Sequence, residues 1–224
     1  MIPYKDDNPT YSFPFVTIGI ILLNVIAFFW EITSRSGMKE ITYAFGAIPY
    51  NILTFETRQP INPVFTVFSS MFMHGGFFHL AGNMLYLWIF GNNIEDRLGH
   101  LRFIIFYIFC GTFAAYAHAI TDPQSTTPMI GASGAISGIL GAYILLFRKA
   151  MVHTVIFLGF FITTVKISAL IVIGFWAIIQ FLNGLLSTGL HDGGGIAWFA
   201  HIGGFLVGLV TIKLWLPRRT KHWS

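Results

Sequence analysis

Long stretches without a single charged residue are the strongest constraint on how this chain of 224 residues can fold. A helix that crosses a bilayer needs roughly 20 consecutive apolar residues. Six uncharged runs reach about that length, and a seventh, at 150–165, is shorter. The long runs cover residues 8–30, 59–94, 103–121, 123–147, 167–191 and 193–212. The sequence therefore predicts a polytopic membrane protein, and it excludes a water-soluble enzyme and a disordered chain.

Composition agrees with this prediction, since 55% of the residues are hydrophobic and only 10% are charged. Soluble domains usually carry about 25% charged residues. We expect an all-α membrane protein with one domain over 1–224, a core at roughly 10–215 and a short basic tail at 216–224. The segment 150–165 is expected to be a loop or interfacial segment. The six transmembrane helices are expected near 13–31, 78–94, 101–120, 132–148, 166–187 and 197–215.

The 13 basic residues predict an orientation, because cytoplasmic loops carry an excess of Lys and Arg. If the first helix starts inside, only three basic residues are outside: Arg35, Lys39 and Arg58. The inner ones are Lys5, Arg97, Arg102, Arg148, Lys149, Lys166, Lys213, Arg218, Arg219 and Lys221. We therefore expect both termini in the cytoplasm. As a separate expectation, the membrane is the cytoplasmic membrane of a prokaryote. The basic charge is then a topology signal, and no nucleic-acid partner is expected.

The connection between the first two expected helices, residues 32–77, is too long and too apolar for a simple linker. Its apolar and aromatic residues include Phe45, Ile48, Pro49, Tyr50, Ile52, Leu53, Phe55, Phe65 and Phe68. We expect this first outer loop to be partly embedded in the outer interface, with its aromatic side chains toward lipid.

Three polar residues, His74, His79 and Asn83, fall in or next to the second expected helix. Polar and ionisable groups inside a membrane cost a few kcal/mol, so each one needs a reason. His79 and Asn83 are four residues apart, which places them on one helix face. A hydrogen bond to a neighbouring backbone carbonyl, with a role in packing only, remains open for each of them.

Ser133 lies in the glycine-rich sequence Gly-Ala-Ser-Gly, where a serine usually serves close helix packing. The polar stretch 122–127 and Pro128 nevertheless place it at a helix N-terminus on the outer side. Free backbone N–H groups and the helix dipole favour a developing negative charge there. A serine nucleophile needs such an oxyanion site beside it.

His201 is the expected partner of Ser133, although a packing role for this histidine remains open. Small-residue stripes on the two helices lie just inward of Ser133 and His201, and such stripes let helix backbones touch. If the helices pair, His201 can take a proton from Ser133 and return it to a leaving amine. Asp192, in the loop before the last helix, is not assigned a triad role. The stripes consist of Gly134 and Gly138 in one helix and Gly204 and Gly208 in the other.

Four motifs in order resemble those of the rhomboid intramembrane serine proteases, over nearly all of the expected six-helix core. The pattern His-x-x-x-x-His-x-x-x-Asn is met by His74, His79 and Asn83. Glu-x-Arg is met by Glu95 and Arg97, Gly-x-Ser-Gly by residues 131–134, and Ala-His-x-x-Gly by residues 200–204. Each motif alone is weak, whereas the ordered set on helices of suitable length is specific.

The resemblance implies a role for each matching residue. Ser133 would be the nucleophile and His201 the general base, and the side chains of His79 and Asn83 with the Ser133 backbone N–H would hold the oxyanion. No metal or cofactor is implied. The positions with structural roles would be His74, Glu95, Arg97, Gly131, Gly134, Gly204 and Gly208.

The resemblance also implies substrates, namely transmembrane segments of single-pass membrane proteins, and a bilayer as the environment. The loops 121–131 and 188–196 would bound a water-filled cavity, with the glycines 193–195 as a mobile cap. No oligomeric state follows from the sequence.

The sequence departs from the family pattern in two features. Some rhomboids carry an aromatic residue four positions after the nucleophile, stacked on the catalytic imidazole, and here that position is Ser137. Phe199 and Phe205 are then the candidates for holding the ring. The Trp-Arg pair often found in the first outer loop is replaced by Phe65-Thr66.

Other functions fit the sequence less well. A rhomboid-like pseudoprotease, which binds membrane helices without cleaving them, typically lacks the serine or the histidine, and both are present. A metalloprotease would need a His-Glu-x-x-His motif, which is missing. An aspartyl protease needs two membrane-embedded aspartates, whereas Asp122 and Asp192 fall in loops. A transporter with a histidine proton path would be favoured by an inverted repeat, which the sequence lacks.

Overall fold

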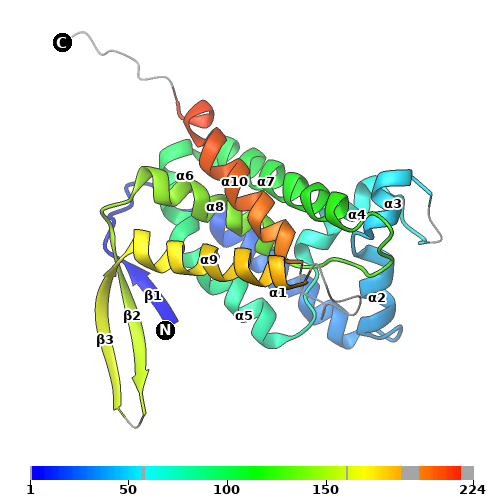
Figure 1. The fold of residues 1–224 in the computed structure, drawn as a ribbon, viewed down its shortest axis with the longest axis horizontal. Helices are drawn as coiled ribbons and strands as arrows, with labels where there is room; N and C mark the ends of the chain where they lie inside the picture. Colours follow the sequence, from blue (N-terminus) through cyan, green and yellow to red (C-terminus); the bar gives the residue numbers. More distant parts are fainter. Residues whose placement is uncertain (1, 57–58, 160, 188–196, 218–224) are drawn as a thin grey trace.

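The computed structural model describes residues 2–56, 59–159, 161–187 and 197–217. Long helices lie side by side in one bundle, with a small sheet at one end (Figure 1). They are α1 (Phe15–Thr33), α7 (His100–Thr121), α8 (Ser133–Leu146), α9 (Ala169–Ser187) and α10 (Trp198–Trp215). Helix α8 is the central one, since every residue from Gly134 to Tyr143 is buried.

Four helices are long and apolar enough to cross a membrane, namely α1, α7, the segment Ala169–Leu186 of α9, and α10. A fifth span results if Pro63–Phe72 and Phe77–Leu98, which bend by 83° at their junction, count as one. Helix α8 is a shorter apolar helix. The prediction of a mainly helical, multi-pass membrane protein is thereby confirmed.

The second expected helix begins at α5 (Phe77–Tyr86) and continues through a π-helical turn, η2 (Leu87–Gly91), into α6 (Asn92–Leu98). Residues Leu87, Ile89 and Phe90 of this turn are buried among the other helices. The continuous rod therefore carries side chains from the site region at its start to the opposite end of the bundle.

The apolar connection at 32–77 folds into short helices: α2 (Met38–Phe45), α3 (Pro49–Thr54), α4 (Pro63–Ser69) and the 3-10 turn η1 (Ser70–Phe72). Ile48 and Ile52 are buried, whereas Phe55 and Phe65 are exposed. Apolar residues in this connection thus divide between a packed inner side and an outer side.

A three-stranded antiparallel sheet corrects the all-α expectation. It consists of β1 (Ile2–Asp6), β2 (Met151–Leu158) and β3 (Phe161–Ser168), in the order β1-β2-β3. The segment expected as a loop or interfacial segment therefore forms a hairpin with β2 as its first strand. The physical reason lies in its many β-branched and aromatic residues, which favour extended structure, together with the edge that β2 offers to β1.

Some predicted features lie outside the described residues. These are the basic residues Arg58, Arg218, Arg219 and Lys221, and Asp192 with the glycines 193–195 of the expected cap.

Candidate active site

Ser133 and His201 lie in direct contact, each near the N-terminus of its helix. Ser133 is the first residue of α8, and His201 lies in the first turn of α10. The Nε2 atom of His201 is 2.8 Å from the Oγ atom of Ser133. This is the distance of a hydrogen bond from a hydroxyl to an imidazole nitrogen, and it permits proton transfer.

Glycines bring the two helices this close. A Cβ atom built on Gly204 would overlap the carbonyl oxygen of Gly134, and one on Gly208 would overlap that of Gly138. The two backbones therefore touch along the stripes that the sequence spacing predicts. On the other side of α8, a Cβ on Gly134 would lie 2.7 Å from the Cβ of Ala114 in α7.

The loop before Ser133 is held by backbone hydrogen bonds to the apolar connection at 32–77. Met129 and Ala47 exchange two bonds, of 2.8 and 3.0 Å, as an isolated antiparallel bridge. The N–H of Gly131 donates to the carbonyl oxygen of Ser70 at 2.8 Å. The short helices of this connection therefore position the start of α8, which gives the connection a role in the site.

Two observations explain why residue 131 is a glycine. Its φ angle is +121°, a conformation that favours glycine. A Cβ atom built there would lie 2.8 Å from Nε2 of His79 and 3.5 Å from Oγ of Ser133. The space above Gly131 is thus bordered by a ring nitrogen of His79 and by the hydroxyl oxygen of Ser133.

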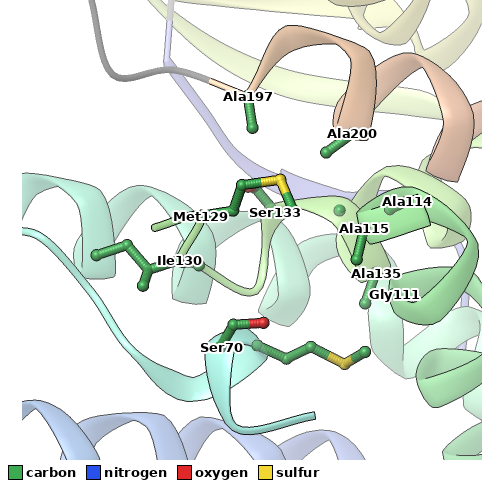
Figure 2. Close-up of a pocket in the computed structure, with 13 residues that line it drawn as sticks. Ser70, Gly111, Ala114, Ala115, Met129, Ile130, Ser133, Ala135, Ala197 and Ala200 are labelled. Carbon is green, nitrogen blue, oxygen red and sulfur yellow. The ribbon is translucent and has the colours of Figure 1, made fainter. Parts of the chain in front are cut away.

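A cavity of about 40 Å³ opens beside Ser133. Figure 2 shows Ser133 between Met129, Ser70 of the connection at 32–77 and the first residues of the α10 region, Ala197 and Ala200. The cavity exceeds the roughly 15 Å³ that one water occupies on this measure, so a water or a small side chain fits beside the hydroxyl. Its lining residues are Ser70, Met71, Gly111, Ala114, Ala115, Met129, Ile130, Gly131, Ser133, Gly134, Ala135, Ala197 and Ala200.

His79 and Asn83 both lie on α5, as their spacing predicts, but they have different partners. The side-chain amide of Asn83 donates to Nε2 of His74 at 2.9 Å. His79 is exposed, and its ring packs edge-on against that of His74 with centroids 5.0 Å apart. Of the two expected oxyanion residues, His79 therefore points to the space above Gly131, while Asn83 is engaged with His74.

His74 precedes α5, in the bend after η1, and is fully buried. Its backbone N–H donates to both carboxylate oxygens of Glu31, at 3.2 and 3.1 Å. Glu31 was missed by the sequence analysis, although a buried carboxylate near the end of an apolar helix is costly without a partner. The hydrogen bonds between His74 and Glu31 connect the bend to α1 and thereby help to position His79.

The ring of His201 is surrounded by α9 and by its own helix. Trp176 of α9 lies with its ring centroid 6.0 Å from that of His201, and Trp198 packs edge-on at 6.3 Å. Within the described residues, neither of the two candidates, Phe199 and Phe205, makes a ring contact with His201, and Phe205 packs on Trp176 instead. The hydroxyl of Ser137 donates to the carbonyl oxygen of Ser133 at 2.6 Å.

Gln180 of α9 is a second residue that the sequence analysis missed. Its Oε1 atom is 2.7 Å from Nδ1 of His201, and its side chain is buried. The signal was present, because an amide side chain in a mainly apolar membrane helix needs a reason. The sequence did not indicate which side chain it would meet.

Glu95 is the centre of a hydrogen-bond network at the other end of the bundle. Its carboxylate accepts from the backbone N–H groups of Val16 and Thr17, from the hydroxyl of Thr17 and from Nδ1 of His100, at 2.6 to 2.9 Å. It thereby caps the N-terminus of α1. Arg97 is exposed and makes no hydrogen bond or ion pair within the part of the chain that the structure describes.

The geometry defines a class: a multi-pass membrane protein with a serine and a histidine in contact beside a small cavity. Comparison with known proteins gives the family. The Rhomboid domain matches residues 62–218, and the chain belongs to the rhomboid family. The matched range contains α8, α10 and the helix that carries His79.

Individual relatives agree with the family match. The chain is 28% identical to "Rhomboid protease GluP" of Bacillus subtilis (strain 168) over 219 residues, which is 96% of this chain and 37% of that protein. It is 38% identical to "RHOMBOID-like protein 5" of Arabidopsis thaliana over 74 residues, 33% of this chain and 24% of the relative. It is 31% identical to "Presenilin-associated rhomboid-like protein, mitochondrial" of Bos taurus over 130 residues, which is 55% of this chain and 31% of that protein. The chain thus spans well under half of the length of these relatives.

Proposed function

We propose that this protein is an intramembrane serine endopeptidase that cleaves transmembrane segments of membrane proteins with a Ser133–His201 dyad, through an acyl-enzyme. The contact of 2.8 Å between His201 Nε2 and Ser133 Oγ carries the proposal. The printed name of the Bacillus subtilis relative, a rhomboid protease, supports it.

In the first half-reaction, Ser133 Oγ attacks the carbonyl carbon of the peptide bond while His201 Nε2 takes the hydroxyl proton. The carbonyl oxygen becomes an oxyanion in a tetrahedral intermediate. His201 then gives the proton to the amide nitrogen, the carbon–nitrogen bond breaks, and the amine product leaves. An ester of Ser133 with the other half of the substrate remains.

In the second half-reaction, His201 takes a proton from water, and the resulting hydroxide attacks the ester carbonyl carbon. The tetrahedral intermediate collapses, the carboxylic acid product leaves, and the proton returns to Ser133 Oγ. The cavity beside Ser133 has room for this water.

The oxyanion would lie in the space above Gly131, near Nε2 of His79 and the backbone N–H of Ser133. Asn83 would join them once its amide exchanges His74 for the oxyanion. Donors of this kind each contribute about 10²- to 10³-fold to kcat.

The depth of the site follows from the length of α8. Its 14 residues extend about 21 Å, at about 1.5 Å per residue, whereas the hydrocarbon core is about 30 Å thick. If the C-terminal end of α8 lies at one membrane surface, Ser133 lies about 9 Å below the other. A peptide bond inside the membrane is then within reach of the hydroxyl.

Topology and substrate complete the proposal. The spans would be α1, the rod from α5 to α6, α7, α8, α9 and α10, with both termini in the cytoplasm and Ser133 toward the outer face. The substrates would be single-pass membrane proteins, and the outer helices at 32–77 would lie in the outer interface.

Labelling with a fluorophosphonate probe tests the proposal, because the probe reacts with an activated serine. The purified protein in detergent is compared with Ser133→Ala, His201→Ala and, as a control one helical turn away, Ser137→Ala. We expect labelling of the wild type and of Ser137→Ala, and at least 10²-fold less in the other two variants. Cleavage of a transmembrane substrate should show the same pattern.

Equal labelling or cleavage by Ser133→Ala would contradict the assignment of the nucleophile. A folded wild type that binds transmembrane segments but neither reacts with the probe nor cleaves would instead indicate a rhomboid-like pseudoprotease.

A further inference from the structure

Gln180 lies on the side of the His201 ring that faces away from Ser133. Its Oε1 atom is 2.7 Å from Nδ1 of His201, and Nε2 of the same ring is 2.8 Å from Ser133 Oγ. An amide oxygen accepts only, so Nδ1 carries a proton in this contact. Nε2 is then unprotonated, which is the tautomer that can take the serine proton.

Helix α9 presents two contacts to this ring. Trp176 and Gln180 are four residues apart, hence on one helix face, and both lie against His201. Ser137 has no aromatic ring to stack on His201. Instead, α9 provides the ring of Trp176 and a hydrogen-bond acceptor in Gln180. Within the described residues, no carboxylate is within hydrogen-bond distance of the His201 ring.

We infer that Gln180 is the positioning residue of the dyad: it holds His201 in the tautomer and orientation that general-base catalysis requires. In serine hydrolases the third group does this work by accepting a hydrogen bond from the second ring nitrogen. A neutral amide does the same in a membrane without the cost of a second buried charge. This inference rests on the proposed function of the dyad.

Three variants test it. Gln180→Met keeps the size of the side chain and removes the acceptor, Gln180→Glu keeps an acceptor at the same reach, and Asn183→Leu removes another amide from α9. We expect Gln180→Met to lower kcat roughly 10- to 100-fold with KM nearly unchanged. Gln180→Glu should recover most of kcat, and Asn183→Leu should stay within about twofold of the wild type.

A second readout does not depend on activity. Nitrogen-15 spectra of the eight histidines, with His201 assigned by its loss in His201→Gln, report which ring nitrogen carries the proton. We expect a single Nδ1–H form in the wild type and a mixture in Gln180→Met. A Gln180→Met protein with wild-type kcat and a wild-type tautomer would overturn the inference, whereas cleavage by Ser133→Ala would overturn only the proposed dyad.

An independent observation concerns the hairpin of β2 and β3. Within the described residues, strand β1 pairs with β2 up to Ile2 and Val155, and the described part of the hairpin beyond that pair is two-stranded. This tip is apolar on both faces, with Phe157, Phe161 and Ile162 exposed by 54%, 78% and 68%. A two-stranded hairpin with such a tip is poorly stable in water.

The base of the same hairpin is polar and charged. Lys166 and His153 both contact Asp7, and the exposed residues Arg148 and Lys149 precede β2. Val152 and Thr154 of β2 are fully buried, so the base is packed onto the bundle. The hairpin runs crosswise to α9 and extends away from the bundle at the end where α9 begins (Figure 1).

We propose that the tip of this hairpin inserts into the membrane interface at that end of the bundle, while its basic base lies among the lipid headgroups. Apolar and aromatic residues are favoured at that depth, and Lys and Arg bind anionic lipids. In the proposed orientation this is the cytoplasmic leaflet. The proposal does not depend on catalysis.

Nitroxide labels test it in vesicles of phosphatidylethanolamine and phosphatidylglycerol. Ile162→Cys places a label at the tip, and Thr164→Cys places one on the same face of the same strand, nearer the base. Cys110 is the only cysteine and is fully buried, so the unmutated protein is the labelling control. We expect the Ile162→Cys label to be several-fold more accessible to oxygen than to a water-soluble nickel complex, and the Thr164→Cys label to show the reverse. Equal access of the nickel complex to both labels would overturn the proposal.

Discussion

The two ends of α8 use polar side chains in opposite ways. At its N-terminal end, Ser133 and His79 border a cavity and the open space above Gly131. At its C-terminal end, Tyr143 Oη and the amide of Asn93 both donate to the buried carboxylate of Asp6, at 2.6 and 2.8 Å. Polar groups at the C-terminal end are enclosed and bind each other, whereas Ser133 and His79 at the N-terminal end border open space.

This difference predicts that substitutions at the C-terminal end mainly affect stability, whereas substitutions at the N-terminal end mainly affect activity. Buried polar groups with partners stabilise a fold and cost free energy when one partner is lost. Polar groups aimed at a cavity contribute little to the fold and are preorganised for chemistry. Substitutions at the two ends should therefore separate activity from the free energy of unfolding.

The largest effect is expected at the glycine contact between α8 and α10, because both activity and stability depend on it. Gly204→Val would place a branched side chain against the carbonyl oxygen of Gly134, and backbone cannot give way there. We expect α10 to separate from α8, with activity lost at least 10³-fold and the melting temperature in detergent lowered by more than 10 °C. Gly174→Val is the control, since a Cβ at Gly174 meets no atom within 4 Å. A folded, active Gly204→Val protein would contradict the glycine contact.

At the N-terminal end, His79→Ala should separate function from stability. His79 is exposed and borders the space above Gly131, so we expect kcat to fall about 10²- to 10³-fold. The melting temperature should change by no more than about 2 °C, since exposed side chains contribute little. Asn83→Ala is the comparison, because Asn83 is hydrogen-bonded to His74 and should lose stability as well as activity. Equal losses of stability in His79→Ala and Asn83→Ala would contradict the different roles of the two residues.

At the C-terminal end, Asp6→Ala should do the opposite. It leaves Tyr143 and Asn93 without their buried acceptor, which costs about 1–3 kcal/mol in the free energy of unfolding. Activity per folded molecule should stay unchanged. Asp6→Asn keeps an acceptor oxygen and should recover most of the stability. A drop of kcat in folded Asp6→Ala would show that this end is coupled to the site.

The same carboxyl gives a pH prediction. Burial raises the pKa of Asp6 above its ordinary value, although hydrogen bonds from Tyr143 and Asn8 oppose the shift. A raised pKa in the folded state means that the folded protein binds the proton more tightly, so its stability falls as the pH rises from the ordinary value to the raised one. Thermal unfolding of the wild type and Asp6→Asn between pH 3 and pH 7 measures this. The wild type should lose stability relative to the variant over that interval, and a rise would contradict the burial effect.

The smallest effect is expected at Asp7, the next residue along the chain. Hydrogen bonds from His153 and then Lys166 lower the pKa of Asp7, and this carboxyl is accessible to water. The stabilisation is therefore present above the ordinary Asp pKa and is lost as the pH falls through the lowered one. In Asp7→Asn the mobility of a label at Thr164→Cys should rise slightly and lose its dependence on acid pH. If the mobility of the label kept its dependence on acid pH in Asp7→Asn, that dependence would belong to another titrating group.

Much of this arrangement could be predicted from the sequence, for reasons that individual residues make clear. The uncharged runs predicted helices because a membrane leaves few alternatives for an apolar backbone. The glycine spacing predicted the contact of Ser133 with His201, because it places the close approach next to both residues. The neighbours of the His201 ring were missed: Phe199 is two residues away and points to another side of the helix, while Trp176 and Gln180 come from α9.

The sheet could not be predicted from local pattern alone. Strand β2 is stabilised by β1, and this pairing joins segments at opposite ends of the sequence. Short apolar runs do not reveal by themselves whether they form strand or loop, and the partner strand was only five residues long.

The pairing of β1 with β2 also has a consequence for biosynthesis. Roughly 150 residues separate Ile2 from Val155, and ribosomes add about 5–20 residues per second, so β1 waits about 8 to 30 s for its partner. Of the two partners of Asp6, Asn93 is synthesised during that interval and Tyr143 only near its end. The start of the chain therefore reaches its final place only after α8 has been inserted, and closure of the sheet is a late event that marks a correctly assembled bundle.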